Sequence, residues 1–238
     1  SLTTSRYSLS SRLITLIRQR HQMVAVSACY LDHLLLFGTL NAIGHWLAED
    51  WKTVDDTVRQ GASSSQLAIA ENFSTARFQG ILDTKKLGGA GFASHAATYK
   101  TVPWDLSTYD GIEIIYSNGT PFNYTLNLKD YLPEQSQGSR MPSSTEWAFT
   151  FEVKKPDSQS ISESPEITKI FAPWEDFAPF ERGSPKTITS ELKKDHIVQF
   201  SIMARSFFDK QSGPFGITLH SISAAFDPKK KRSETVCL

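Results

Sequence analysis

The chain has 238 residues, of which 39% are hydrophobic and 21% charged, enough apolar material to bury a full core. Its 25 basic residues balance 25 acidic ones, so no global field attracts nucleic acid, and no nucleic-acid partner is expected. The two cysteines, Cys29 and Cys237, lie near opposite ends, which excludes a disulfide framework and favours a reducing compartment.

The first 31 residues have a composition of their own. They contain no Asp or Glu, whereas Arg6, Arg12, Arg18 and Arg20 stand among serines and leucines. This composition is typical of a mitochondrial presequence, and the alternative is a disordered tail. The apolar segment 23–40 is interrupted by Asp32 and His33, so no membrane-spanning helix is predicted.

Short apolar runs open the body of the chain. Residues 34–37 are predicted to form a first strand, and residues 42–51 a brief helix or turn. Residues 66–70 and 75–82 flank the turn residues Glu71 and Asn72, which predicts a hairpin.

A glycine-rich stretch, LGGAGFASHAATYKTVPWDLSTYDGIE, covers residues 87–113. Gly89-x-Gly91-x-x-Ser94 is a near miss to a dinucleotide-binding fingerprint, with Glu113 about twenty residues on. That motif requires an apolar strand before it and a helix after it, but Asp83 to Lys86 precede it and Pro103 follows. The context therefore favours a bulged strand of an all-β domain.

Residues that alternate between apolar and polar dominate the second half of the chain. Phe122, Tyr124, Leu126 and Leu128 alternate with polar residues, and so do Trp147, Phe149, Phe151 and Val153. Each of these segments is predicted to be a strand with one solvated face. Similar patterns occur at residues 112–116, 167–171, 198–204 and 215–219. Eight to ten strands with little helix predict an all-β, antiparallel β-sandwich.

Turn residues mark the connections. Ser117-Asn118-Gly119-Thr120-Pro121 contains the Asn-Gly pair that signals a hairpin. Residues 133–144 and 154–166 are predicted to be surface loops. We therefore expect a β-sandwich domain over residues 32–227, followed by a disordered basic tail over residues 228–238.

Catalytic and metal-binding patterns are absent from the sequence. None of the six histidines has a second ligand at metal-binding spacing, and there is no nucleophile elbow or Walker loop. No catalytic residue, metal or cofactor is predicted. Asp55 and Asp56 offer hard oxygen ligands to calcium, but paired acids before a turn more often accept hydrogen bonds from backbone amides. Trp104, Asp105 and Tyr109 suit a sugar-binding rim, whereas such a tryptophan more often closes a core.

Several spaced motifs resemble those of the complex I intermediate-associated protein 30 family. The first is Trp51 to Ser65, with paired aspartates and a glycine-serine turn; the second is Phe78-Gln79-Gly80 followed by residues 87–94, 104–107 and 109–112. The resemblance covers residues 34–227. One departure is Gln60, which stands where the family usually has the first of two adjacent glycines.

The resemblance implies a galactose-binding-like jelly roll that acts as a non-enzymatic assembly factor for mitochondrial respiratory complex I. The implied location is the matrix side, and peripheral attachment to the inner membrane is compatible with it. The implied partners are immature complex I subunits and other assembly factors. The residues expected to bind partners are Asp55, Asp56, Arg59, Trp104 and Asp110, because they belong to the family motifs and lie in turn-rich segments. A carbohydrate-binding jelly-roll module and an uncharacterised enzyme are the alternatives, and fold alone does not separate them.

Overall fold

The computed structural model describes residues 33–39, 44–99, 101–134, 144–154, 166–187 and 190–230. These residues belong to one compact unit, Asp32–Lys230. The presequence prediction, most of the two predicted surface loops and residues 231–238 of the predicted tail lie outside the described residues.

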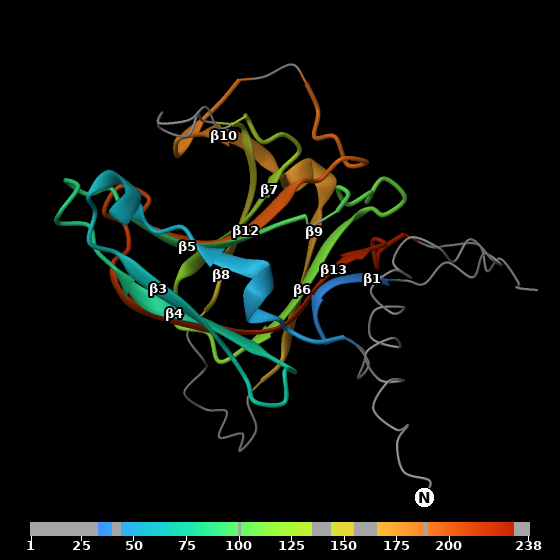
Figure 1. Ribbon diagram of the computed structural model, residues 1–238, viewed down its shortest axis with the longest axis horizontal. Helices are drawn as coiled ribbons and strands as arrows, with labels where there is room; N and C mark the ends of the chain where they lie inside the picture. The colour runs from blue at the N-terminus through green and yellow to red at the C-terminus, as the bar shows by residue number, and fades with distance from the viewer. Residues whose placement is uncertain are drawn as a thin grey trace, which may run out of the picture. The chain divides into compact units, whose positions relative to one another are not determined.

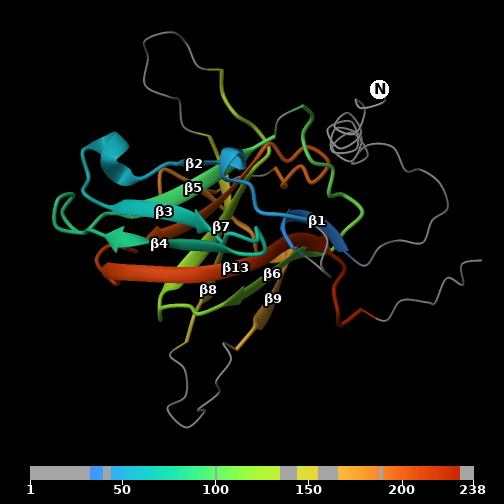
Figure 2. The ribbon, with the colours of Figure 1, turned by 60° about the horizontal axis from the view of Figure 1, so that its bottom comes forward.

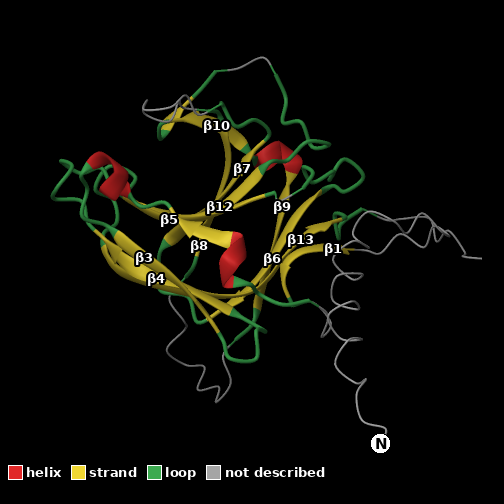
Figure 3. Cartoon of the chain, viewed as in Figure 1, coloured by secondary structure: helices red, strands yellow, loops and turns green. Residues whose placement is uncertain are grey.

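Strands make up nearly all of the regular structure in the described part of the chain (Figure 3). The strands are β1 (His33–Gly38), β2 (Trp51–Thr53), β3 (Ser64–Ile69), β4 (Ala76–Leu82), β5 (Phe92–Thr98), β6 (Gly111–Ser117), β7 (Asn123–Lys129), β8 (Glu146–Glu152), β9 (Thr168–Pro173), β10 (Ala178–Glu181), β11 (Ser184–Pro185), β12 (Gln199–Arg205) and β13 (Gly213–Ala225). Three short 3₁₀ helices accompany them: η1 (Ala48–Asp50), η2 (Asp56–Arg59) and η3 (Trp174–Asp176). The predicted number of strands was too low because β2, β10 and β11 have only two to four residues, too few for a periodic pattern.

Two antiparallel sheets face each other, which confirms the predicted β-sandwich of jelly-roll type (Figure 1). One sheet has the strand order β3-β4-β13-β6-β9, with β1 also paired to β13. The other has the order β11-β10-β8-β7-β12-β5-β2. The long strand β13 pairs with β4 through its first half and with β1 through its second half, so β4 and β1 pair with different halves of the same strand.

The core fills the space between the sheets. Tyr124 and Phe200 from one sheet, and Phe78 and Ile114 from the other, are fully buried. The predicted apolar faces of residues 122–128, 198–204 and 112–116 are therefore confirmed. The hairpin predicted around Glu71 and Asn72 is also confirmed, because β3 pairs with β4 in antiparallel register.

The prediction of a solvated face on β7 is wrong. Thr125 is 0% exposed and Asn127 is 3% exposed, although both lie on the face away from the core. Thr125 bonds to Thr150 on β8, and the Asn127 amide donates to Ser201 on β12. β7 is a central strand, and Arg205 packs between the rings of Phe180 and Phe207 above this part of the molecule. The neighbouring side chains thus exclude water from the polar face.

The Asn-Gly turn does not form a hairpin, contrary to the prediction. It connects β6 to β7, and these two strands belong to different sheets. The Arg77 guanidinium donates to the Asn118 carbonyl, and the Thr120 amide donates to the Gly216 carbonyl at 2.7 Å. These contacts lead the chain across β13 to the other sheet instead of back along β6.

Candidate functional site

Asp55 and Asp56 lie where the edges of the two sheets meet. β2 ends at Thr53, and the chain then forms η2 before it enters β3. The Val54 amide still donates to the Ser94 carbonyl of β5, so the ladder continues for one residue beyond β2. The next backbone amides of β5 and β3 have no neighbouring strand, and the two aspartates take its place.

Each carboxylate accepts hydrogen bonds from both sheets. Asp55 accepts from the amide and hydroxyl of Ser65 in β3, at 2.8 and 2.6 Å, and from the Ser94 amide in β5 at 2.8 Å. Asp56 accepts from the amide and hydroxyl of Ser63, at 3.0 and 2.6 Å, and from the Phe92 amide at 3.1 Å. The aspartate pair therefore joins β3 to β5 by charge-assisted hydrogen bonds.

The aspartate pair is buried, whereas its place in a turn-rich segment predicts exposed charges. Asp55 is 6% exposed and Asp56 is 0% exposed. The physical reason is that unpaired edge amides attract a strong acceptor. The alternative interpretation of the pair, as acceptors for backbone amides, is confirmed, although the amides belong to other strands and not to η2.

Two turn residues beside the aspartate pair show why the motif contains glycine. A Cβ on Gly61 would lie 2.2 Å from a carboxylate oxygen of Asp56, so a side chain there would displace the carboxylate. Gln60 ends η2 in the left-handed region, with φ of 65°. Glycine adopts this conformation without strain, which accounts for the glycine that the family usually has at this position.

His95 lies beside the aspartate pair, on β5. Its Nε2 is 3.5 Å from the Thr53 hydroxyl, and its ring packs edge-on against Phe78. Burial lowers the pKa of His95 below 6.5, and the negative charge of Asp55 opposes this effect only in part.

Arg59 is the accessible member of the predicted set at this end of the sandwich. It is exposed at the end of η2, with its guanidinium carbon 5.6 Å from the centre of the Phe92 ring. The aspartate pair holds the beginning of η2 against β5, and so it positions Arg59.

Trp104 and Asp110 are not brought together with the other three predicted residues. Asp56 bonds to the first residue of β5, whereas Trp104 follows the last one and bridges to Ile197. A strand of seven residues spans roughly 20 Å, so the two groups lie near opposite ends of β5.

The Trp104 ring packs against Phe37 and Phe200, so it closes the core and does not form an open sugar-binding rim. Asp110 accepts from the Asp227 amide and forms an ion pair with Lys230 at 2.8 Å.

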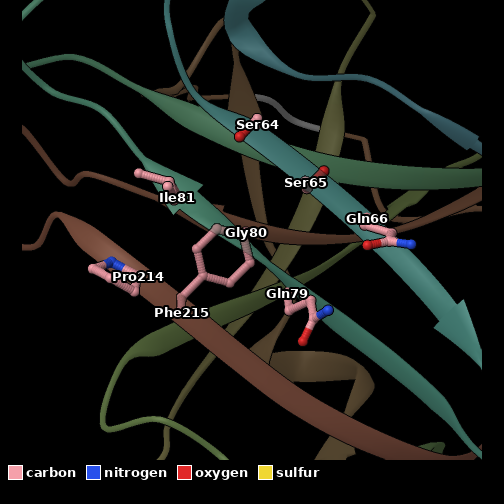
Figure 4. Close-up of a pocket in the computed structure, with 8 residues that line it drawn as sticks. All are labelled: Ser64, Ser65, Gln66, Gln79, Gly80, Ile81, Pro214 and Phe215. Carbon is pink, nitrogen blue, oxygen red and sulfur yellow. The ribbon is translucent and has the colours of Figure 1, made fainter.

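Sequence reasoning did not find the pocket on the outer face of β3, β4 and β13. It has a volume of about 430 Å³ and is lined by Ser64, Gln66, Gln79, Ile81 and Pro214, with the Phe215 ring beneath Gly80 (Figure 4). Its lining has no charged side chain, and none of the predicted site residues belongs to it. Gly80 allows a close approach of β3 and of the Phe215 ring, since a Cβ there would lie 2.0 Å from the Ser64 carbonyl oxygen and 3.0 Å from the ring. No pattern in the sequence signals the hollow itself.

Among the described residues, no group of three or more His, Cys, Asp or Glu side chains could hold a metal ion, and no helix is long and apolar enough to cross a membrane.

Comparisons with known proteins give one family and a set of distant structures. The model of the family "Complex I intermediate-associated protein 30 (CIA30)" matches residues 44–219. A relative described as "Uncharacterized protein C9E9.15", from Schizosaccharomyces pombe, is 37% identical over 195 residues, which cover 80% of this chain and 83% of the relative.

The solved structures are much less similar in sequence. The family 11 carbohydrate-binding module of cellulase Lic26A-Cel5E from Clostridium thermocellum is 14% identical, with a TM-score of 0.48, and the match covers 84% of this chain and 99% of the module. An exo-beta-agarase is 12% identical, with a TM-score of 0.42, and the match covers 82% of this chain and 25% of the agarase. The match to the family model extends over most of the sandwich, from the segment before η1 into β13. The chain belongs to the complex I intermediate-associated protein 30 family.

Proposed function

We propose that the protein is a non-enzymatic assembly factor for mitochondrial respiratory complex I, which binds immature subunits together with other assembly factors on the matrix side of the inner membrane. The observation that carries this proposal is the family match over residues 44–219. The residues of the aspartate pair and Gly61, which shape the edge of the sandwich, fall inside the matched region. We assign residues 1–31 to the presequence, 32–227 to the sandwich domain and 228–238 to a basic tail.

The accessible charges of the family motifs are the best candidates for partner contacts. Arg59 is exposed on η2, and Asp110 lies at the other end of β5 within reach of solvent. Asp55 and Asp56 support the segment that carries Arg59 from inside, since rigid strands position the segments that carry binding groups. We therefore propose Arg59 and Asp110 as contact residues, and the aspartate pair as the support for η2.

The test is deletion of the gene followed by measurement of assembled complex I. We expect reduced complex I, restored by the wild-type chain. Arg59→Ala should fold, because an exposed cation–π contact contributes only about 0.5–1 kcal/mol, but it should fail to restore complex I fully. Lys169→Ala, an exposed lysine on β9, is the matched control and should restore it.

Normal complex I in the deletion strain would refute the proposed role. Selective binding to a glycan array together with normal complex I would favour the carbohydrate-binding alternative instead. Sequencing the N-terminus of the protein from purified mitochondria tests the location, because removal of residues up to about position 31 is expected on import.

A further inference from the structure

Three segments gather at one end of the sandwich: η2, residues 83–91 and residues 206–212 (Figures 1 and 2). The Ser206 amide donates to the Gly91 carbonyl, and the Asp209 amide donates to the Gly89 carbonyl, both at 2.9 Å. Asp56 of η2 accepts from the Phe92 amide next to Gly91. We call this surface the loop end. These hydrogen bonds hold its three segments in one arrangement.

Phe208 projects from the loop end. It is 77% exposed, more than any other large hydrophobic side chain among the described residues. Phe207, Phe208 and Asp209 all have positive φ, at 49°, 57° and 67°. Three consecutive left-handed residues without glycine are costly and persist only where the surroundings enforce them.

The surroundings of this turn do enforce it. The Lys210 and Gln211 amides both donate to the Ser206 carbonyl. The Gln211 side chain accepts from the Asn123 amide and donates to the carbonyls of Asn123 and Arg205. The loop therefore presents the Phe208 ring to solvent from a fixed backbone.

The loop end also carries basic side chains. Lys85, Lys86, Lys210 and Arg59 are exposed on the three segments of the loop end. Three acids also lie there: Asp209 is exposed, Asp83 is half-buried and accepts a hydrogen bond from the Lys86 amide, and Asp56 is buried. The exposed charges of the loop end are therefore four positive and one negative, in a chain whose formal net charge is zero.

We propose that the loop end binds the surface of an anionic phospholipid bilayer, with Phe208 inserted at the boundary between headgroups and acyl chains and Lys85, Lys86 and Lys210 against the phosphates. A ring that projects from the surface can insert into a bilayer without a preformed pocket, because the lipids rearrange around it. Basic residues near an anionic leaflet add attraction. A protein partner would instead need a complementary hollow with acidic groups around it. The proposal does not depend on a role in complex I assembly.

The test measures sedimentation of the full chain with vesicles of phosphatidylcholine containing 30% phosphatidylglycerol, and with vesicles of phosphatidylcholine alone. To remove binding by the terminal segments, the four arginines of residues 1–31 and the basic residues 229–232 are changed to Ser in every sample. We expect binding to the anionic vesicles only, and weaker binding as salt is raised.

Phe208→Asn removes the ring and keeps a residue that tolerates positive φ, so the loop should retain its conformation. We expect an affinity about ten-fold lower, from the loss of the inserted apolar surface. Lys85→Ala with Lys86→Ala should lower the affinity by about five-fold per lysine. Phe73→Asn is the matched control, because Phe73 also has positive φ and is 50% exposed, but lies in the β3–β4 turn.

Sedimentation with anionic vesicles that is unaffected by Phe208→Asn and by the double lysine variant would overturn the proposal. So would the absence of sedimentation, or an equal loss in the Phe73→Asn control. Circular dichroism of each variant excludes unfolding as the cause. Capture of a protein partner that depends on Phe208 without any vesicle binding would assign the loop end to a protein and overturn the lipid proposal.

Discussion

Two adjacent carboxylates without a neighbouring cation are costly to bury, and the structure offsets this cost with six hydrogen-bond donors. Asp55 and Asp56 each accept from two backbone amides and one serine hydroxyl. The four amides among them would otherwise be edge groups without a partner strand. The arrangement explains why serines follow the aspartates in the sequence: Ser63 and Ser65 each supply two of the donors. The pair thus contributes to the connection between the sheets more than to recognition.

Asp56→Asn should therefore destabilise the protein strongly. The amide group cannot accept at both positions, so one of the three buried donors faces another donor. We expect the free energy of unfolding to fall by about 2–3 kcal/mol, as for a lost hydrogen bond to a charged group. Urea denaturation measures the change.

Asp105→Asn is the matched control, because Asp105 accepts the same kind of bonds, from the amide and hydroxyl of Ser107, at an exposed position. Its cost should stay below about 1 kcal/mol. If both variants lowered the free energy of unfolding by a similar amount, burial of the aspartate pair would not determine how much the pair contributes to stability.

One buried and one half-buried histidine make stability depend on pH. Burial lowers the pKa of His95 and of His220 below the value of 6.5 in the unfolded chain. The folded protein therefore favours the neutral ring, and below pH 6.5 the unfolded chain binds protons that the folded chain does not. The stabilisation is present in full above pH 6.5 and is lost as the pH falls through the lowered pKa values.

We expect urea midpoints to decrease between pH 7.5 and 5.5, with a smaller decrease in His95→Gln. His196→Gln, at an exposed position, controls for the replacement of a histidine as such. An unchanged pH dependence in His95→Gln would contradict the assignment.

At the scale of elements, the short helix η2 ends at a residue with an unfavourable backbone conformation, and the surroundings of the helix compensate for it. Gln60 closes it in the left-handed region, where most side chains are strained, and donates its amide to the carbonyls of Asp56 and Thr57. The strain is tolerated because Asp56 holds the other end of η2 and Gly61 leaves room for the carboxylate. The sequence alone showed the departure from the family's paired glycines, and the structure shows that glutamine adopts the left-handed conformation at this position.

Gln60→Gly should consequently stabilise the protein. The left-handed conformation costs a residue with a Cβ roughly 1–2 kcal/mol, while glycine loses about 0.5–1 kcal/mol more backbone entropy on folding. We expect a net gain of up to about 1 kcal/mol, visible as a higher urea midpoint. Thr57→Gly, within the same helix, has only the entropic cost and should lower the midpoint. A lower midpoint for Gln60→Gly would mean that the side chain makes a favourable contact that outweighs the strain.

At the scale of the whole molecule, patterns of period two predicted the fold well, but they did not predict which strands become neighbours. The faces of β6, β7 and β12 followed from alternation, since the core residues recur at every second position. The Asn-Gly turn was misassigned because the residues of a turn indicate that the chain reverses direction. They do not indicate which sheet the chain enters next.

The burial of Thr125 and of the aspartate pair was missed for a related reason. It depends on groups distant in sequence, such as the Ser94 amide and the Thr150 hydroxyl, whose positions no local pattern encodes.

A single hydrogen bond across the sandwich tests how strongly the two sheets depend on each other. The Tyr124 hydroxyl, from the seven-stranded sheet, accepts from the Gly216 amide of the six-stranded sheet at 3.0 Å. Burial raises the pKa of Tyr124 to about 12, so the phenol stays neutral at physiological pH. Tyr124→Phe keeps the ring packed and leaves the buried amide without an acceptor, which should cost about 1–3 kcal/mol.

If the sandwich unfolds as one unit, this variant should lower the urea midpoint without changing the slope m. Tyr131→Phe, at a side chain that is 62% exposed, should change stability by less than about 0.5 kcal/mol. A biphasic transition in Tyr124→Phe would show instead that the two sheets unfold separately, because a weakened contact between independent units would destabilise only one of them.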